Sequence, residues 1–146
     1  MTFKKTKARV AKPALHLEPQ FRSRLEKRIN DQLKEAGVRF EYESEKLDYD
    51  VPARKAKYLI DFKLLPNGII VEAKGWLQAK DRQKMILVKE QHPDRDIRFV
   101  FERASNPIYK GSKTSYAKWA EDHGFPYADK GVIPQSWLDE KTKPRK

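Results

Sequence analysis

Two apolar segments separated by a tight turn constrain the fold of this chain more than any other feature. YLIDFKLL (58–65) and GIIVEAKG (68–75) flank the sequence LPNG (65–68), in which Pro, Asn and Gly supply the backbone dihedrals that a tight hairpin requires. The pattern therefore predicts two antiparallel strands. Because GIIV is typical of a buried strand, we expect this hairpin to lie inside the domain.

Three charged side chains are expected to meet on this hairpin. Glu72 and Lys74 are two positions apart on one strand, so their side chains leave the same face, with Cα atoms roughly 7 Å apart. If the turn is centred on Pro66–Asn67, Asp61 lies opposite Glu72, and if it is centred one residue later, Asp61 lies opposite Lys74. A three-residue loop with a bulge would change that parity. Both of the first two registers bring Asp61, Glu72 and Lys74 together.

Two carboxylates and an ammonium in one patch fit metal-assisted phosphodiester hydrolysis. Carboxylate oxygens suit Mg²⁺ or Mn²⁺, and one or two such ions would neutralise developing charge and lower the pKa of a bound water. Lys74 could orient or deprotonate that water, or stabilise the charge. The alternative is that Asp61, Glu72 and Lys74 form ordinary cross-strand charge pairs on a solvated face. Burying several charges without a function is costly, which favours the site.

The charge distribution indicates a polyanionic partner. The chain has a net charge of +11, and nine basic residues lie in its two ends, which leaves 23 basic and 21 acidic residues between them. Basic arms bind phosphate with salt-sensitive, sequence-independent affinity, although a solubilising role is the alternative. We expect DNA contacts from Lys4, Lys5, Lys7, Arg9, Lys12 and Arg22.

The length of 146 residues is that of one domain. We expect a basic arm at 1–20, a single domain at 21–140 and a basic tail at 141–146. The sequence has no Cys, and its three His have no ligand-like spacing, so a zinc site is not expected. It also has no signal peptide and no apolar run near the ~18 residues that a membrane span needs. We therefore expect a cytoplasmic protein without a membrane partner or a small-molecule cofactor.

The remaining periodicities predict alternating helices and strands. An apolar stripe at Phe21, Leu25, Ile29 and Leu33 predicts a helix that Gly37 ends. The following strand over 38–43 would turn Glu41 away from the apolar side. The segment 47–58 shows no clear period and contains Pro52, so a connection or extended bridge is expected there. Further predicted elements are helices at 79–92 and 114–124, a strand at 96–102, and a C-terminal segment through Trp137 that packs on the body.

Taken in order, these features resemble known nucleases. The succession of helix, strand, Asp, turn and Glu-x-Lys resembles the core of the restriction-enzyme-like nucleases. More closely, the chain from about Phe21 to Trp137 resembles the phage-encoded endonuclease I family, the Holliday-junction-resolving enzymes. Ile60 stands where the broader motif often has Pro, and the first twenty residues align poorly. The matching segments, in family order, are FRSRLE, FEYE, LPNGI, VEAKG, EQHP, DIRFVF, YKGSKTSY and IPQSW.

The resemblance implies a role for each residue of the hairpin site. Asp61 and Glu72 would bind Mg²⁺, with Mn²⁺ as a substitute, and the main-chain carbonyl of Ala73 would complete the metal site. Lys74 would be the catalytic lysine.

Two further acids enter through the resemblance. Glu26 would be another acidic member of the catalytic site, and its position at the edge of the apolar stripe permits this. The alternative is a surface acid paired with Arg22. Glu41 matches a family residue implicated in activity, although a solvated strand acid is nearly as good an explanation.

The resemblance also implies an α/β restriction-endonuclease-like fold, with a mixed sheet flanked by helices, in an intertwined, domain-swapped homodimer. The bridge would lie at about 49–58, and Glu26 of one subunit would complete a site with Asp61, Glu72 and Lys74 of the other. Two such sites would resolve four-way and other branched DNA with paired nicks. The alternatives are a non-catalytic basic DNA-binding or architectural protein, and a nuclease that degrades duplex DNA without branch preference.

Overall fold

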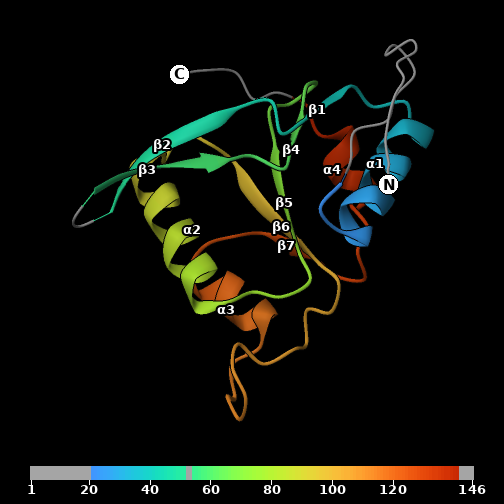
Figure 1. Cartoon of the computed structure of the whole chain (residues 1–146). Coiled ribbons are helices and arrows are strands. Elements are labelled where there is room, and N and C mark those ends of the chain that lie inside the picture. Colours follow the sequence, from blue (N-terminus) through green and yellow to red (C-terminus); the bar gives the residue numbers. More distant parts are fainter. Residues whose placement is uncertain (1–20, 52–53, 142–146) are drawn as a thin grey trace, which may run out of the picture.

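A mixed five-stranded sheet forms the centre of the molecule in the computed structural model, which describes residues 21–51 and 54–141 (Figure 1). Its strand order is β1-β4-β5-β6-β7, with antiparallel pairing from β1 to β5 and parallel pairing from β5 to β7. The predicted mixed sheet is therefore confirmed. Its strands are β1 (Phe40–Tyr42), β4 (Phe62–Leu64), β5 (Ile70–Lys74), β6 (Ile97–Phe101) and β7 (Tyr127–Ala128).

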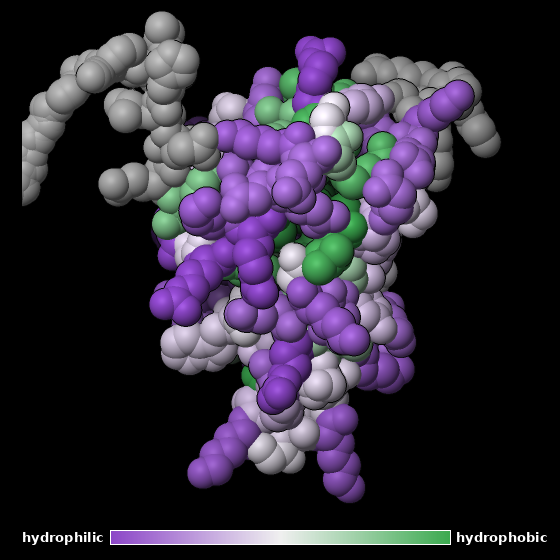
Figure 2. Space-filling model, turned by 90° about the vertical axis from the view of Figure 1, so that its right-hand side faces the viewer, coloured by the Kyte–Doolittle hydropathy of each residue, from purple (hydrophilic) through white to green (hydrophobic). Residues whose placement is uncertain are grey.

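Helices cover both faces of the sheet, as Figure 1 shows. α1 (Arg24–Glu35) and α4 (Gln135–Asp139) pack on one face, while α2 (Ala79–Gln91) and α3 (Tyr116–Asp122) pack on the other. Each face has its own hydrophobic core. Hydrophilic side chains cover most of the outer surface on the α1 side (Figure 2). In the described part of the chain, no helix has both the length and the apolar character that crossing a membrane requires.

The central hairpin has the first of the two predicted registers. Phe62 pairs with Val71 and Lys63 with Ile70, so Asp61, just before β4, lies opposite Glu72. The loop closes through a 2.9 Å hydrogen bond from Leu64 N to Ile69 O. Its last residue, Gly68, has a φ of +76°, which a residue with a side chain rarely adopts.

α1 forms because a capping residue precedes an apolar stripe. Ser23 is its N-cap, and the Ser23 hydroxyl accepts a 3.1 Å hydrogen bond from the main-chain N–H of Glu26. Leu25, Ile29 and Leu33 are buried as predicted. Phe21 was expected to extend this stripe, but the helix begins at Arg24, and the Phe21 ring instead packs edge-on against Tyr42.

The segment expected to be a connection or extended bridge is a two-stranded ribbon instead. β2 (Lys46–Val51) and β3 (Arg54–Leu59) pair antiparallel in a separate sheet. The prediction of no clear period was wrong, because Leu47 and Tyr49 face the core while their neighbours are exposed. The ribbon packs on the end of α2. There the Gln91 side chain accepts a hydrogen bond from the main-chain N–H of Asp50 and donates one to the main-chain oxygen of Asp50.

The C-terminal segment packs back on the body, as predicted. Trp137 in α4 is buried in the α1-side core, and the Arg98 guanidinium lies 5.2 Å from the centre of its ring. The Asn67 side chain donates hydrogen bonds to the main-chain oxygens of Trp137 and Glu140. This contact joins the hairpin turn to the C-terminal helix and thereby fixes the strand pair that carries Asp61 and Glu72.

Candidate active site

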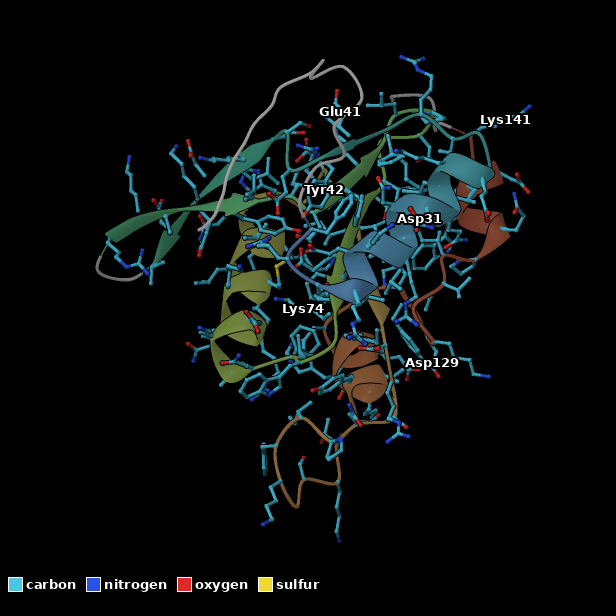
Figure 3. The ribbon with its side chains drawn as sticks, turned by 45° about the vertical axis from the view of Figure 1, so that its right-hand side comes forward. Asp31, Glu41, Tyr42, Lys74, Asp129 and Lys141 are labelled. Carbon is cyan, nitrogen blue, oxygen red and sulfur yellow. The ribbon has the colours of Figure 1, made fainter. Side chains whose placement is uncertain are left out.

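A cavity of about 650 Å³ lies where β5 extends past the beginning of β4. Because β4 starts only at Phe62, side chains from both faces of the sheet reach this point. Asp61, Glu72 and Lys74 line the cavity together with Glu26 from α1. In Figure 3, Lys74 lies between α1 and α2. Asp61, Glu72 and Lys74 therefore lie together, as the strand pattern predicts, and Glu26 of the same chain lies beside them.

Asp61 is held in a fixed orientation at the floor of the cavity. The residue is only 3% exposed. Oδ2 accepts a 3.0 Å hydrogen bond from the main-chain N–H of Ala73, and Oδ1 accepts a 3.3 Å bond from Arg22 Nη2. Burial, together with the charges of Glu72 and Glu26, raises the pKa of Asp61 well above its usual value. A bound cation would offset both the burial of the Asp61 carboxylate and its repulsion by Glu72 and Glu26.

Glu72 has an equally constrained carboxylate. It is 3% exposed, and Oε1 accepts a 2.6 Å hydrogen bond from the Tyr58 hydroxyl, which the ribbon strand β3 supplies. Oε2 lies 3.6 Å from Lys74 Nζ. Burial raises the pKa of Glu72, while the Lys74 ammonium and the Tyr58 hydrogen bond oppose that shift. Tyr58 was not predicted as a site residue, because nothing in its local pattern indicates that its hydroxyl reaches β5.

Lys74 stands between two carboxylates. Its Nζ lies 3.4 Å from Asp81 Oδ1, in addition to its contact with Glu72. Burial lowers the pKa of Lys74, but the charges of Glu72 and Asp81 outweigh burial, so the pKa is raised. Sequence reasoning missed Asp81. Its third position in α2, after Gln78, is a capping-box pattern and could have indicated an oriented carboxylate at this helix end.

Glu26 is only 5% exposed, so the alternative of a surface acid is wrong. One of its oxygens, Oε1, accepts hydrogen bonds from the main-chain N–H of Arg22 at 2.9 Å and from the Tyr42 hydroxyl at 2.8 Å. The helix N-terminus and the first strand of the sheet therefore hold this carboxylate jointly.

Glu43 is a further acid that the strand pattern concealed. Alternation over 38–43 predicted that Glu43 would face outward, but β1 ends at Tyr42 and Glu43 has a φ of +49°. The kink brings a Glu43 oxygen to within 4.8 Å of oxygens of Glu26 and Asp61. Glu43 Oε2 is buried without a hydrogen bond, although Arg22 Nε lies 3.0 Å away. These three carboxylates form a group with the spacing of cation ligands.

The main-chain carbonyl of Ala73, predicted as a metal ligand, faces the same edge as Asp61. In an extended strand, the N–H and C=O of one residue point to the same side. Because the Ala73 N–H is bonded to Asp61 Oδ2, the Ala73 carbonyl also faces the end of β4. At that level β4 has not yet begun.

Glu41 is the predicted catalytic residue that does not line this cavity. Figure 3 shows it well apart from Lys74. Its carboxylate accepts a 2.6 Å hydrogen bond from the Ser44 hydroxyl and lies 3.6 Å from Lys63 Nζ. This placement fits the alternative of a solvated strand acid.

Of the residues predicted to contact DNA, only Arg22 lies in the part of the chain that the structure describes. Arg22 lines the cavity and its side chain is largely exposed, although its guanidinium also faces Asp61 and Glu43. The other predicted contacts, Lys4, Lys5, Lys7, Arg9 and Lys12, lie outside the described residues, as do positions 142–146 of the tail.

Comparison with known proteins shows the family to which this chain belongs. Residues 7–145 match the family described as Phage endonuclease I. The protein named Endonuclease I from Escherichia phage T7 is 49% identical over 123 residues, which cover 84% of this chain and 81% of that protein. Endodeoxyribonuclease 1 from Enterobacteria phage T3 is 46% identical over 123 residues, covering 84% and 80% respectively. The chain therefore belongs to the phage endonuclease I family.

Proposed function

We propose that this protein is a metal-dependent endodeoxyribonuclease that cuts four-way and other branched DNA with paired nicks. The observation that carries the proposal is the convergence of Asp61, Glu72 and Lys74 in one cavity, in a chain of the phage endonuclease I family. The names of the T7 and T3 relatives describe endonucleases. Phosphodiester hydrolysis needs groups that bind a cation and stabilise charge, and this cavity holds both kinds.

The carboxylates of the cavity fit a hard divalent cation. Burial raises the pKa of Asp61 and of Glu72, and the Arg22 guanidinium already lies against Asp61 and Glu43, so the site attracts positive charge. We propose Mg²⁺, replaceable by Mn²⁺, held by Asp61, Glu72 and the Ala73 carbonyl. Such an ion would lower the pKa of a bound water and neutralise charge on the phosphate.

One or two ions would serve. The grouping of Asp61 with Glu26 and Glu43 supports a second ion, because their oxygens lie within 4.8 Å of one another. Glu43 Oε2, buried without a hydrogen bond, is a further oxygen that a cation would satisfy.

Lys74 is best suited to stabilise charge. The sequence left open whether it deprotonates a water or holds a negative oxygen. Glu72 and Asp81 raise its pKa, which keeps the ammonium protonated at neutral pH. A protonated Lys74 donates hydrogen bonds to a phosphate oxygen as charge develops there. Tyr58 contributes by fixing the carboxylate of Glu72 beside it.

We further propose a restriction-endonuclease-like fold and an intertwined homodimer. The β2–β3 ribbon, which contains most of the predicted bridge at 49–58, extends beyond the five-stranded sheet (Figure 1). It packs on the α2 of its own chain and supplies Tyr58 to Glu72. If two subunits exchanged elements, the same contacts would form between them. A two-fold axis would then place one site against each of two strands, which accounts for paired nicks.

A synthetic four-way junction, incubated beside a linear duplex of the same sequence in Mg²⁺ or EDTA, tests the proposal. We expect paired symmetric nicks near the branch in Mg²⁺ and none in EDTA. In sedimentation experiments, we expect the protein to be a dimer. Equal cutting of both substrates would support nuclease activity but exclude selectivity for branched DNA. Binding without cutting in Mg²⁺ or Mn²⁺ would contradict the proposal and favour an architectural DNA-binding protein.

A further inference from the structure

Trp76 places a large aromatic side chain in water at the edge of the candidate active site. It is 71% exposed and is the most exposed large hydrophobic residue among those that the structure describes. Trp76 lines the same cavity as Lys74, which precedes it by two positions in the chain. None of the roles assigned to the cavity above uses this ring.

The backbone that presents Trp76 is fixed on both sides. Lys74 ends β5, and Leu77 is fully buried and donates a 3.1 Å hydrogen bond from its N–H to the Tyr116 hydroxyl. At Gly75 the chain runs so close to Glu102 that an added Cβ would lie 3.1 Å from Oε1. The backbone of Trp76 is therefore held at a fixed place relative to Lys74, which suits a preformed contact surface.

The rim around Trp76 is basic, while the floor of the cavity is acidic. Arg54 and Lys57 reach the rim from β3, and Lys80 and Lys84 reach it from α2. The acids that line the cavity are buried instead. A strand entering the cavity would thus meet cations beside its phosphates and an aromatic ring beside its bases. Proteins that bind single strands of nucleic acid combine these two features.

We propose that Trp76 is a stacking platform for a nucleobase of the DNA strand whose phosphates contact this basic rim. The inference rests on the proposed function, because it assumes a DNA substrate. In an intact duplex each base face is covered by its neighbours, whereas a branch or gap leaves a face free to stack on the ring. Trp76 would therefore be a specificity-determining residue that favours branched over continuous DNA.

Tryptophan fluorescence tests the stacking of Trp76 directly. Trp119 and Trp137 are only 5% and 8% exposed, so their emission should change little when DNA binds. In EDTA, we expect quenching of the full-length protein by a four-way junction and much weaker quenching by linear duplex. Trp76→Ala should bind the junction about ten-fold more weakly and bind the duplex within about two-fold of wild type. Trp76→Phe, which keeps a stacking ring, should stay within about three-fold of wild type.

Tyr109→Ala is the matched control, since it removes an exposed aromatic ring that does not line the cavity. It should bind the junction like wild type. The inference is overturned if Trp76→Ala retains wild-type junction affinity, or loses junction and duplex affinity equally. If wild type binds and cuts the junction in Mg²⁺, either of these outcomes for Trp76→Ala excludes the stacking role and leaves the proposed function intact. If wild type neither binds nor cuts, the proposed function fails with it.

Discussion

The ammonium of Lys74 lies 3.4 Å from Asp81 Oδ1, while Oδ2 of the same carboxylate accepts a 3.1 Å hydrogen bond from the main-chain N–H of Gln78. Asp81 therefore caps the start of α2 and holds the lysine of β5 with a single side chain. The orientation of Lys74 is thus set by where this helix begins. We therefore expect Asp81 to position Lys74.

Asp81→Asn separates these two roles. An Asn oxygen can still accept the capping hydrogen bond, whereas the charge that faces Lys74 is lost. We expect cleavage of a four-way junction to slow roughly ten-fold, equivalent to ~1.4 kcal/mol in the barrier, with a melting temperature within a few degrees of wild type. Single-turnover rates and calorimetry measure the two quantities. Wild-type rates in this variant would exclude a positioning role for Asp81.

Tyr58→Phe removes the hydroxyl that orients Glu72. We expect a loss of ~1 kcal/mol in the free energy of unfolding, because a buried hydrogen bond is lost, and a several-fold lower cleavage rate. Tyr127→Phe is the matched control, since the Tyr127 hydroxyl also donates to a carboxylate, that of Glu121, outside the cavity. Equal cleavage rates in the two variants would argue against a role for Tyr58 in the site.

Stability should depend on pH through Glu45. Hydrogen bonds from Arg95 and Lys63 lower the pKa of Glu45 to about 2 in the folded protein, against 4.5 for the free side chain. The folded state therefore gains stability from this group above about pH 4.5, and loses it as the pH falls through about 2. Glu45→Gln should cost about 1–2 kcal/mol at pH 7, after allowance for partial exposure.

Denaturant unfolding at pH 7, 4 and 2.5 measures this effect. The difference between wild type and Glu45→Gln should shrink as the pH falls, because the protonated Glu45 resembles the amide. A difference that stays constant over this range would show that the ion pair with Arg95 does not stabilise the fold.

Deleting residues 1–13 tests the basic arm. Five basic residues would be removed, so junction binding should weaken and the slope of log affinity against log salt should flatten by up to about 4. Measurements between 50 and 200 mM salt are well suited to this comparison. An unchanged slope would mean that the arm makes no phosphate contacts.

The hairpin site followed from the sequence because its information is local. Strand alternation and the LPNG turn were enough to predict that Asp61 lies opposite either Glu72 or Lys74, and the observed pairing places it opposite Glu72. The helix stripe likewise predicted that Leu25, Ile29 and Leu33 would be buried. Each of these features depends on residues within about fifteen positions of one another.

The features that the sequence did not reveal depend on backbone departures or on distant contacts. A positive φ turns Glu43 out of the strand pattern and toward Asp61. Tyr58 meets Glu72 only because the ribbon folds onto the sheet, and the ribbon itself was missed because Pro52 outweighed the alternation around Tyr49. Periodicity contains no information on such tertiary contacts.

The central claim is that Asp61, Glu72 and Lys74 form the hydrolytic site, and two substitutions test it most directly. Cleavage and binding of a four-way junction would be measured in parallel for wild type, Glu72→Gln and Lys74→Ala, with cleavage in Mg²⁺ and binding in EDTA. We predict that both variants lose at least a hundred-fold in cleavage rate and keep junction affinity within a few-fold. Undiminished cleavage by either variant would contradict the assignment of this cavity as the active site.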